Sequence, residues 1–295
     1  MINRWMKNWK SFITDFFAAV GFLMLMVEVA QYFFPDFTKI RDHFLSFIVI
    51  SVLFGICKNR PRNSFTGKIR DKDSWVELKI GDAFSNKGAL VVPINNELDL
   101  YLGGNVKKAK SILNKLLMDY FDSKEEHLKS DLAEKLSSDS PPFPIGKAIE
   151  IEQKGKRFYL LVNSTKNENN RVSSTFDDFL MALNGLWDFL SSDASKGESV
   201  SIPLINTQHG RNSLITRNTV IKHIIDTFID ASKYKCICEK LIISIHPSDI
   251  QKGDLDFDQL CEYLEFQCKN YKDIKFDIKA VGKEIESSVI STIEA

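Results

Sequence analysis

The stretch WVELKIGDAFSNKGALVVPINN, residues 75–96, decides the fold because it holds two apolar, β-rich runs joined by a turn. The runs cover residues 75–80 and 89–94, and similar runs recur later, alternating with segments of helical periodicity. This alternation is typical of an α/β sandwich around a mostly parallel sheet, here predicted as a three-layer α/β/α domain with a mixed sheet. The remaining predicted strands are 148–151, 158–162, 200–205, 241–245 and 274–280, and the predicted helices are 106–120, 176–190, 219–231 and 257–271.

Outward from this stretch, the sequence predicts where the domain begins. Residues 59–73 are polar, charged and rich in residues that break regular structure, so they are predicted to form a linker. The domain is then expected to cover residues 74–295. Within it, residues 123–140 are charged and serine-rich, which indicates an inserted, solvated helix or loop.

The first 58 residues contain two apolar runs. One begins with FFAAVGFLMLMV at residues 16–27 and continues past Glu28, and the other is FLSFIVISVLFGIC at residues 44–57. We predict a transmembrane helical hairpin over residues 1–58, with spans at about 12–34 and 40–57. A buried helical hairpin of a soluble protein is the alternative, because runs of this length are ambiguous.

The charges around these runs predict an orientation. Basic residues lie before the first run and after the second, whereas the connecting loop is balanced in charge. By the positive-inside bias, both termini are expected to face the cytoplasm from the inner membrane. Glu28 is costly at membrane depth unless it is protonated, paired or facing water, so we expect it to face another helix or a pore. An interfacial position in a tilted helix is the alternative. Ser51 and Gly55 offer a small-residue face for close packing.

Composition excludes some functions. The 39 Lys and Arg residues equal the 39 Asp and Glu residues, so no basic field favours nucleic acid as a partner. The five cysteines form no paired framework, and the histidines lack metal-ligand spacing. We therefore expect reduced thiols, no metal and no cofactor.

Polar and glycine residues follow several of the predicted strands. In open α/β sheets a ligand lies outside the carboxyl ends of the strands, so these residues are the candidate ligand-binding set. Glycines before a helix let the backbone approach a phosphate, and an arginine adds a charge-assisted bond. The candidates are Asp82, Asn95, Asn96, Gly103, Gly104, Asn105, Val106, Thr207, Gln208, His209, Gly210, Arg211 and His246.

Each candidate also has a purely structural interpretation. Asp82 could cap a turn, His246 could be a structural hydrogen-bonding residue, and His209 could face solvent. A Gly-Gly pair before a helix is commonly a plain turn.

The order of these motifs resembles that of macro domains. Gly81-Asp82-Ala83, a strand ending in Asn95, the glycine-rich loop at 103–106 and the Pro203 strand leading into 207–211 follow the family pattern. The resemblance implies that Asp82 accepts from the adenine amino group, that both loops hold the diphosphate, and that Asn95 lies near the distal ribose. The ligand it implies is an ADP-ribose derivative.

Two departures from the family pattern bear on catalysis. The family's Asn-Ala-Ala-Asn stretch is reduced to Val92-Pro93-Ile94-Asn95, and Asn105 replaces the third glycine of the loop. Because those features position the catalytic water in hydrolytic members, the resemblance implies a binding domain with no enzymatic activity.

The whole architecture resembles the membrane-anchored macro-domain effectors of type II Thoeris antiphage defence, the two-span ThsA form. That resemblance implies an NAD-derived signal nucleotide made by a TIR-domain partner, followed by homo-oligomerisation of the hairpins, membrane disruption and cell death. Two other functions stay open: a membrane-tethered ADP-ribosyl hydrolase, and a scaffold whose domain has no ligand.

Overall fold

The computed structural model describes residues 9–33, 44–60, 62–98, 111–136, 140–167, 169, 172–192, 197–205, 216–251 and 255–270. The chain divides into two compact units, Met1–Asn63 and Ser64–Ala295. Each unit is described by itself below.

The first unit consists of two helices that pack against each other, α2 (Trp9–Phe33) and α3 (Phe44–Lys58). Near the start of α2, Asp15 accepts from the Lys58 ammonium at 2.6 Å and from the Asn59 amide at 2.9 Å. Phe12, one turn earlier, lies against Gly55. The beginning of α2 is therefore fixed to the end of α3, and the pair is antiparallel.

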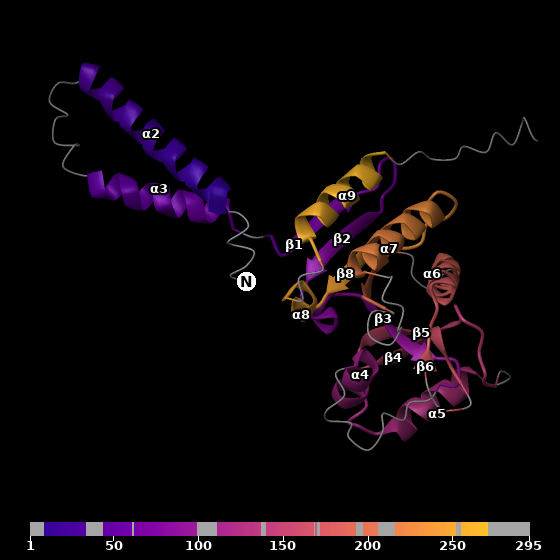
Figure 1. Ribbon diagram of the computed structural model, residues 1–295. Helices are drawn as coiled ribbons and strands as arrows, with labels where there is room; N and C mark the ends of the chain where they lie inside the picture. Colours follow the sequence, from indigo (N-terminus) through magenta and orange to yellow (C-terminus); the bar gives the residue numbers. More distant parts are fainter. Residues whose placement is uncertain are drawn as a thin grey trace, which may run out of the picture. The chain divides into compact units, whose positions relative to one another are not determined.

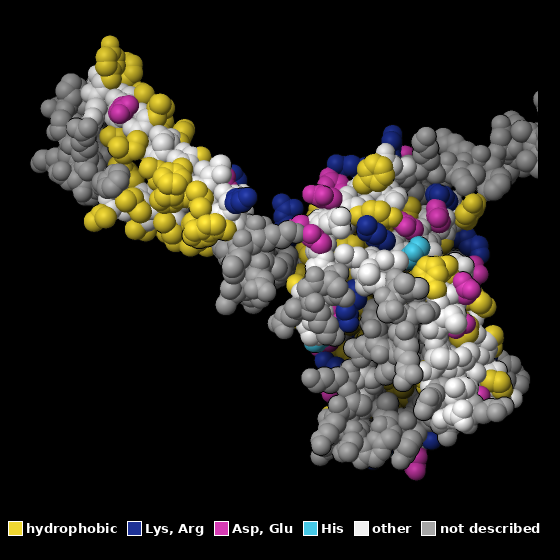
Figure 2. Space-filling view, viewed as in Figure 1, with side chains coloured by type: hydrophobic (Ala, Val, Ile, Leu, Met, Phe, Trp, Pro, Cys, Tyr) yellow, Lys and Arg dark blue, Asp and Glu magenta, His cyan; other side chains and the backbone are white. Residues whose placement is uncertain are grey.

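Apolar side chains cover the outside of both helices (Figure 2). Helix α2 has no buried residue, and its 25 residues make it long and apolar enough to cross a bilayer by length and composition. Among the described residues it is the one helix that meets this test, because α3 has only 15 residues. A single candidate span is thus supported, and the predicted second span is not confirmed.

The small-residue face predicted at Ser51 and Gly55 is occupied within the chain. Ser51 is fully buried, and a Cβ added at Gly55 would lie 2.8 Å from the Phe12 ring. This face therefore packs against α2 of the same chain, which leaves it no room for a neighbouring hairpin in this arrangement.

The second unit is built on one mixed sheet (Figure 1). The strand order is β1-β2-β8-β7-β3-β5-β4, and β6 pairs with β5. Pairing is parallel from β2 through β5 and antiparallel where β1, β4 and β6 join. The strands are β1 (Ser64–Lys68), β2 (Trp75–Ile80), β3 (Ala89–Asn95), β4 (Ala148–Gln153), β5 (Lys156–Lys166), β6 (Val172–Ser173), β7 (Ser199–Pro203) and β8 (Lys240–Ile245).

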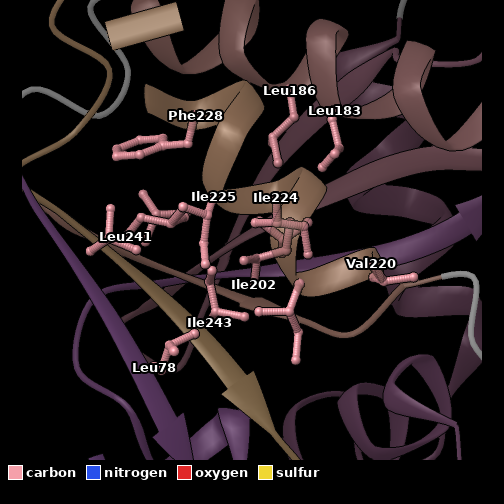
Figure 3. Close-up of a cluster of buried hydrophobic side chains, with 14 of the residues drawn as sticks. Leu78, Leu183, Leu186, Ile202, Val220, Ile224, Ile225, Phe228, Leu241 and Ile243 are labelled. Carbon is pink, nitrogen blue, oxygen red and sulfur yellow. The ribbon is translucent and has the colours of Figure 1, made fainter. Parts of the chain in front are cut away.

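Helices cover both faces of this sheet. Side chains along a strand alternate between the two faces, so each buried strand contributes to two apolar clusters. Val91 and Leu161 enter one apolar cluster, whereas their neighbours Leu90 and Leu160 enter a second cluster. The first cluster lies under α6 (Phe176–Ser191), α7 (Arg217–Ser232) and α9 (Phe257–Lys269), as Figure 3 shows for α6, α7 and the sheet. The second lies under α4 (Ile112–Tyr120) and α5 (Glu125–Lys135). The macro-like three-layer arrangement predicted from the sequence is confirmed.

The domain begins earlier than the sequence indicated. Strand β1 lies inside the predicted linker of residues 59–73, it pairs with β2, and the following Ile69 is fully buried. Gly67 accommodates the Cys268 sulfur of α9, 2.9 Å from where a Cβ would lie. Helix α9 therefore packs against β1 and holds this edge strand on the domain. The polar composition of residues 59–73 did not predict the strand.

The remaining secondary-structure predictions fare unevenly. The predicted strand at 274–280 and the start of the predicted helix at 106–120 lie outside the described residues. The solvated insertion at 123–140 contains α5, which buries Leu128 and Leu132. A further helix, α8 (Pro247–Gln251), follows β8.

Candidate functional site

Three of the predicted site residues lie at one edge of the sheet. Strands β2, β8, β7 and β3 are adjacent and parallel, so their carboxyl ends meet. Asp82 follows β2, Asn95 ends β3, and His246 follows β8. The Gly81 amide donates to the Ile245 carbonyl at 2.9 Å, which joins the loop of Asp82 to that of His246.

Asp82 is engaged through both carboxylate oxygens. Oδ1 accepts from the Phe84 amide at 3.1 Å and so caps the short helix η2 (Ala83–Ser85). Oδ2 forms an ion pair with the Lys115 ammonium from α4. The turn-cap interpretation of Asp82 is therefore correct for one oxygen, while the second oxygen faces a cation that a ligand donor could replace.

The protonation of Asp82 follows from these contacts. Partial burial by itself raises its pKa, but the bonds from Lys115 and the Phe84 amide outweigh that effect, so the pKa lies below its usual value. Asp82 is thus an anionic acceptor at neutral pH, as recognition of an amino group requires.

An open pocket of about 450 Å³ lies beside Asp82. Its wall includes Phe84 and Tyr120, whose rings stack with centroids 6.0 Å apart, and the Lys115 ammonium lies 4.9 Å from the Phe84 centroid. Lys154 and Asp119 also line the pocket, and the Lys154 ammonium donates to the Asp119 carbonyl at 2.9 Å. An aromatic ring next to a carboxylate suits a planar base that carries an amino group.

Asn95 and Asn96 make different hydrogen bonds at the end of β3. The Asn96 side-chain oxygen accepts from the Lys166 amide at 2.8 Å, and its backbone bonds to Ser164 and Phe143. Asn96 therefore joins β3 to its surroundings, as a structural residue. The Asn95 side-chain oxygen accepts from the Glu97 amide at 3.0 Å and forms a turn at the end of β3.

His246 is exposed, and its Nδ1 accepts from the Ser248 amide at 3.2 Å. The Ser248 hydroxyl also lies 2.7 Å from Nδ1. The structural interpretation of His246 is therefore correct for Nδ1.

The two predicted phosphate loops lie outside the described residues. They contain Gly103, Gly104, Asn105 and Val106 in the first loop, and Thr207, Gln208, His209, Gly210 and Arg211 in the second. The described chain resumes after the second loop at Thr216, which caps α7. Their predicted role as anion-binding loops stays a prediction.

Sequence reasoning missed several residues around the site. Lys115 and Lys156 lie in regular elements, where a lysine ordinarily indicates only a solvated face. Arg217 opens α7 and contacts Asp249 of α8, with 3.2 Å from Nε to Oδ1, although the side chains are only 15% and 9% exposed. The position of Arg217, six residues after the end of the predicted phosphate loop at 207–211, was the available signal. No cluster of three or more metal-ligating side chains occurs within the described ranges.

Together, the mixed sheet, its two helical layers and the polar groups at the carboxyl edge define a macro-like α/β domain. A family model described as "Thoeris protein ThsA, Macro domain" matches residues 76–246, more than half of the 295 residues. The chain belongs to this family.

The solved structures to which this chain is similar include three of the Oceanobacillus iheyensis macrodomain. A mutant of the Oceanobacillus iheyensis macrodomain is 14% identical, with a TM-score of 0.46 over 70% of this chain and 97% of that one. The same macrodomain with MES bound is 15% identical, with a TM-score of 0.45 over 68% and 97%. Another mutant, described as "with ADPR", is 15% identical, with a TM-score of 0.40 over 70% and 97%. No curated protein sequence matches.

Proposed function

We propose that this chain is a membrane-anchored sensor of an ADP-ribose-type nucleotide in antiphage defence. The observation that carries the proposal is the ThsA macro-domain match at residues 76–246 in a chain that also holds the exposed apolar helix α2. A chain that holds both a nucleotide-binding domain and a membrane segment can couple binding of a soluble nucleotide to a change in the membrane.

In this proposal the adenine amino group takes the place of Lys115 as the donor to Asp82, and the base lies against Phe84. The exposed Asp82–Lys115 pair supports such an exchange, since their side chains are 47% and 42% exposed and pairs of this kind contribute little stability. The loops at 103–106 and 207–211 hold the diphosphate, and Asn95 lies near the distal ribose.

The signal is an NAD-derived nucleotide made by a TIR-domain partner. Binding leads the membrane hairpins to oligomerise and disrupt the inner membrane, with both termini in the cytoplasm. Helix α3, extended by the residues before it, forms the second span. Because Ser51 and Gly55 are used within the chain, contacts between hairpins fall to the outer apolar face and Glu28.

The strand order suggests how binding reaches the membrane segment. Residues 59–63 connect α3 to β1, which pairs along its whole length with β2. Asp82 comes two residues after the end of β2 at Ile80. A ligand at Asp82 therefore acts on the strand next to the one that leads to the hairpin. The ligand shifts the equilibrium only if it binds the assembled state more tightly than the resting state.

The proposal includes no turnover of the ligand. Asn95 uses its side-chain oxygen to accept from Glu97, and the strand before it is Val92-Pro93-Ile94, with no second asparagine to orient water. A tethered ADP-ribosyl hydrolase is the competing function. It predicts release of ADP-ribose from an ADP-ribosylated protein, and loss of that release in Asn95→Ala.

The test is reconstitution of the full chain in dye-loaded liposomes made from bacterial lipids. Addition of ADP-ribose or its NAD-derived conjugates is expected to release the dye and to produce larger cross-linked oligomers. Asp82→Ala should abolish both responses. Dye release that is independent of nucleotide, or that persists in Asp82→Ala, would contradict the proposal.

A further inference from the structure

The segment that carries Asp82 and Phe84 has little regular structure of its own. It connects β2 to β3, and its regular part, η2, is three residues long. Two backbone carbonyls of this segment accept hydrogen bonds from one distant side chain. The Lys156 ammonium, at the start of β5, donates to the Phe84 carbonyl at 2.7 Å and to the Asn86 carbonyl at 2.9 Å.

A second attachment comes from the Asn86 side chain, which is buried. Its amide nitrogen donates to the Ser201 hydroxyl at 2.9 Å and to the Ser244 hydroxyl at 2.7 Å. The two hydroxyls lie 2.8 Å apart on the neighbouring strands β7 and β8. The segment is thus attached to three strands, and of these three attachments the one to Lys156 carries a charge.

Lys156 is suited to holding this segment. It is half-buried, and burial lowers the pKa of its ammonium while the nearby Asp82 raises it. Two carbonyl acceptors compensate for the water that the ammonium loses, and charge-assisted hydrogen bonds are stronger than neutral ones. Lys156 therefore holds the backbone at Phe84 and Asn86, the residues on either side of Ser85.

We propose that Lys156 is a positioning residue for base recognition: it holds residues 84–86 so that the Asp82 carboxylate and the Phe84 ring meet an adenine base in a fixed geometry. This inference rests on the proposed nucleotide-binding function and names the residue that gives that site its selectivity. Without Lys156 the segment samples other conformations, and the bond from Asp82 to the amino group is no longer aligned.

The test compares the full chain in lipid nanodiscs with Lys156→Met, Lys156→Gln and the control Lys87→Met. Lys87 is exposed and directly follows Asn86, so its substitution removes a positive charge beside the segment without touching the Lys156 hydrogen bonds. Calorimetry measures the affinity for ADP-ribose and for its inosine counterpart, which lacks the amino group. We expect the wild-type chain to prefer ADP-ribose by about tenfold or more, as a bond to a charged acceptor provides.

Lys156→Met should weaken ADP-ribose binding about tenfold and bring the preference close to one, since the aligned bond is lost. Lys156→Gln, which keeps one donor group, should give an intermediate preference, and Lys87→Met should behave as wild type. A loss of stability alone would weaken both nucleotides equally, so the ratio separates positioning from folding.

Hydrogen exchange on the same samples gives a readout without ligand. Lys156→Met should speed exchange of the Ser85 and Asn86 amides while β3 and β5 stay protected. An unchanged preference in Lys156→Met, with wild-type binding intact, overturns the inference and leaves the proposed function standing. Absence of binding by the wild-type chain overturns both. If Lys156→Met unfolds the sheet, Lys156→Gln provides the test. An intermediate preference for ADP-ribose supports the inference, and a wild-type preference overturns it.

Discussion

Helices α2 and α6 are both rich in apolar residues, yet they meet their surroundings in opposite ways. Helix α6 starts with a capping box between Thr175 and Asp178, and it buries one face that includes Leu186 and Trp187. Helix α2 buries nothing, and Phe22 is 63% exposed. An amphipathic helix is stabilised by a protein core on one side, whereas a helix that is apolar all round needs a nonpolar solvent. The apolar exterior of α2 therefore fits the proposed membrane anchor, whereas α6 packs on the core of the domain.

The largest expected effect comes from opening a cavity in the domain core. Phe228 is fully buried, and its ring contacts Trp187 with centroids 5.3 Å apart (Figure 3). Phe228→Ala should lower the free energy of unfolding of the domain by about 3–5 kcal/mol, measured by denaturant titration of the full chain in detergent. The control Phe22→Ala in α2 should change it by less than about 0.5 kcal/mol. Equal losses in both variants would mean that α2 packs on the domain.

A charge placed in α2 tests whether this helix is inserted in the membrane. Phe22→Arg places an arginine near the middle of the helix, where insertion costs about 3 kcal/mol. The fraction of chain that resists carbonate extraction from membranes should fall. Met181→Arg, at a 55% exposed position of α6, should leave that fraction unchanged. If Phe22→Arg remained fully membrane-bound, α2 would not be the anchor.

The contact between α2 and α3 gives the next effect. Gly55→Leu forces a side chain into the Phe12 ring, and overpacking of this kind costs about 1–3 kcal/mol. Disulfide formation between Asp15→Cys and Lys58→Cys, which replace a contacting pair, should fall when Gly55→Leu is added. Gly21→Leu, where nothing lies within 4 Å, is the control and should leave the yield as it was.

The smallest effect concerns the polar contact between α7 and α9. Tyr263 donates to Asp226 at 2.7 Å, yet burial outweighs this bond and raises the pKa of Asp226, while the pKa of Tyr263 rises to about 12. Because the folded-state pKa of Asp226 exceeds the unfolded value of about 3.9, the unfolded chain loses this proton first as pH rises. Stability contributed here therefore falls from about pH 4 upward, until Asp226 ionises in the folded state too.

Asp226→Asn should remove that part of the pH dependence, an effect below about 1 kcal/mol because the site is only partly buried. Thermal unfolding between pH 3 and pH 7 measures it. Asp230→Asn, one turn further along α7 with a 65% exposed carboxylate, removes only a minor cause of the raised Asp226 pKa and should retain most of the wild-type profile. A retained slope in Asp226→Asn would assign the titration to another group.

Much of the domain could be predicted from periodicity, because the buried strands β3, β5 and β8 are continuous apolar runs. Strand β1 could not, since its five residues, SFTGK, contain a single large apolar side chain and depend on pairing with β2 and on packing by α9. Asp82 could be predicted because it directly follows a strand. Lys115 and Lys156 act at Asp82 and Phe84 from 33 and 72 residues away in sequence, and no local pattern carries such contacts.

The central claim is that the edge formed by Asp82, Asn95 and His246 binds an ADP-ribose-type nucleotide. The most direct measurement is calorimetric titration of ADP-ribose and NAD-derived conjugates into the full chain in nanodiscs, wild type beside Asp82→Ala. Saturable binding of at least one of them, recovered uncleaved and weakened at least about tenfold by Asp82→Ala, is the predicted result. No binding of any of these nucleotides, or equal affinity in Asp82→Ala, would contradict the claim.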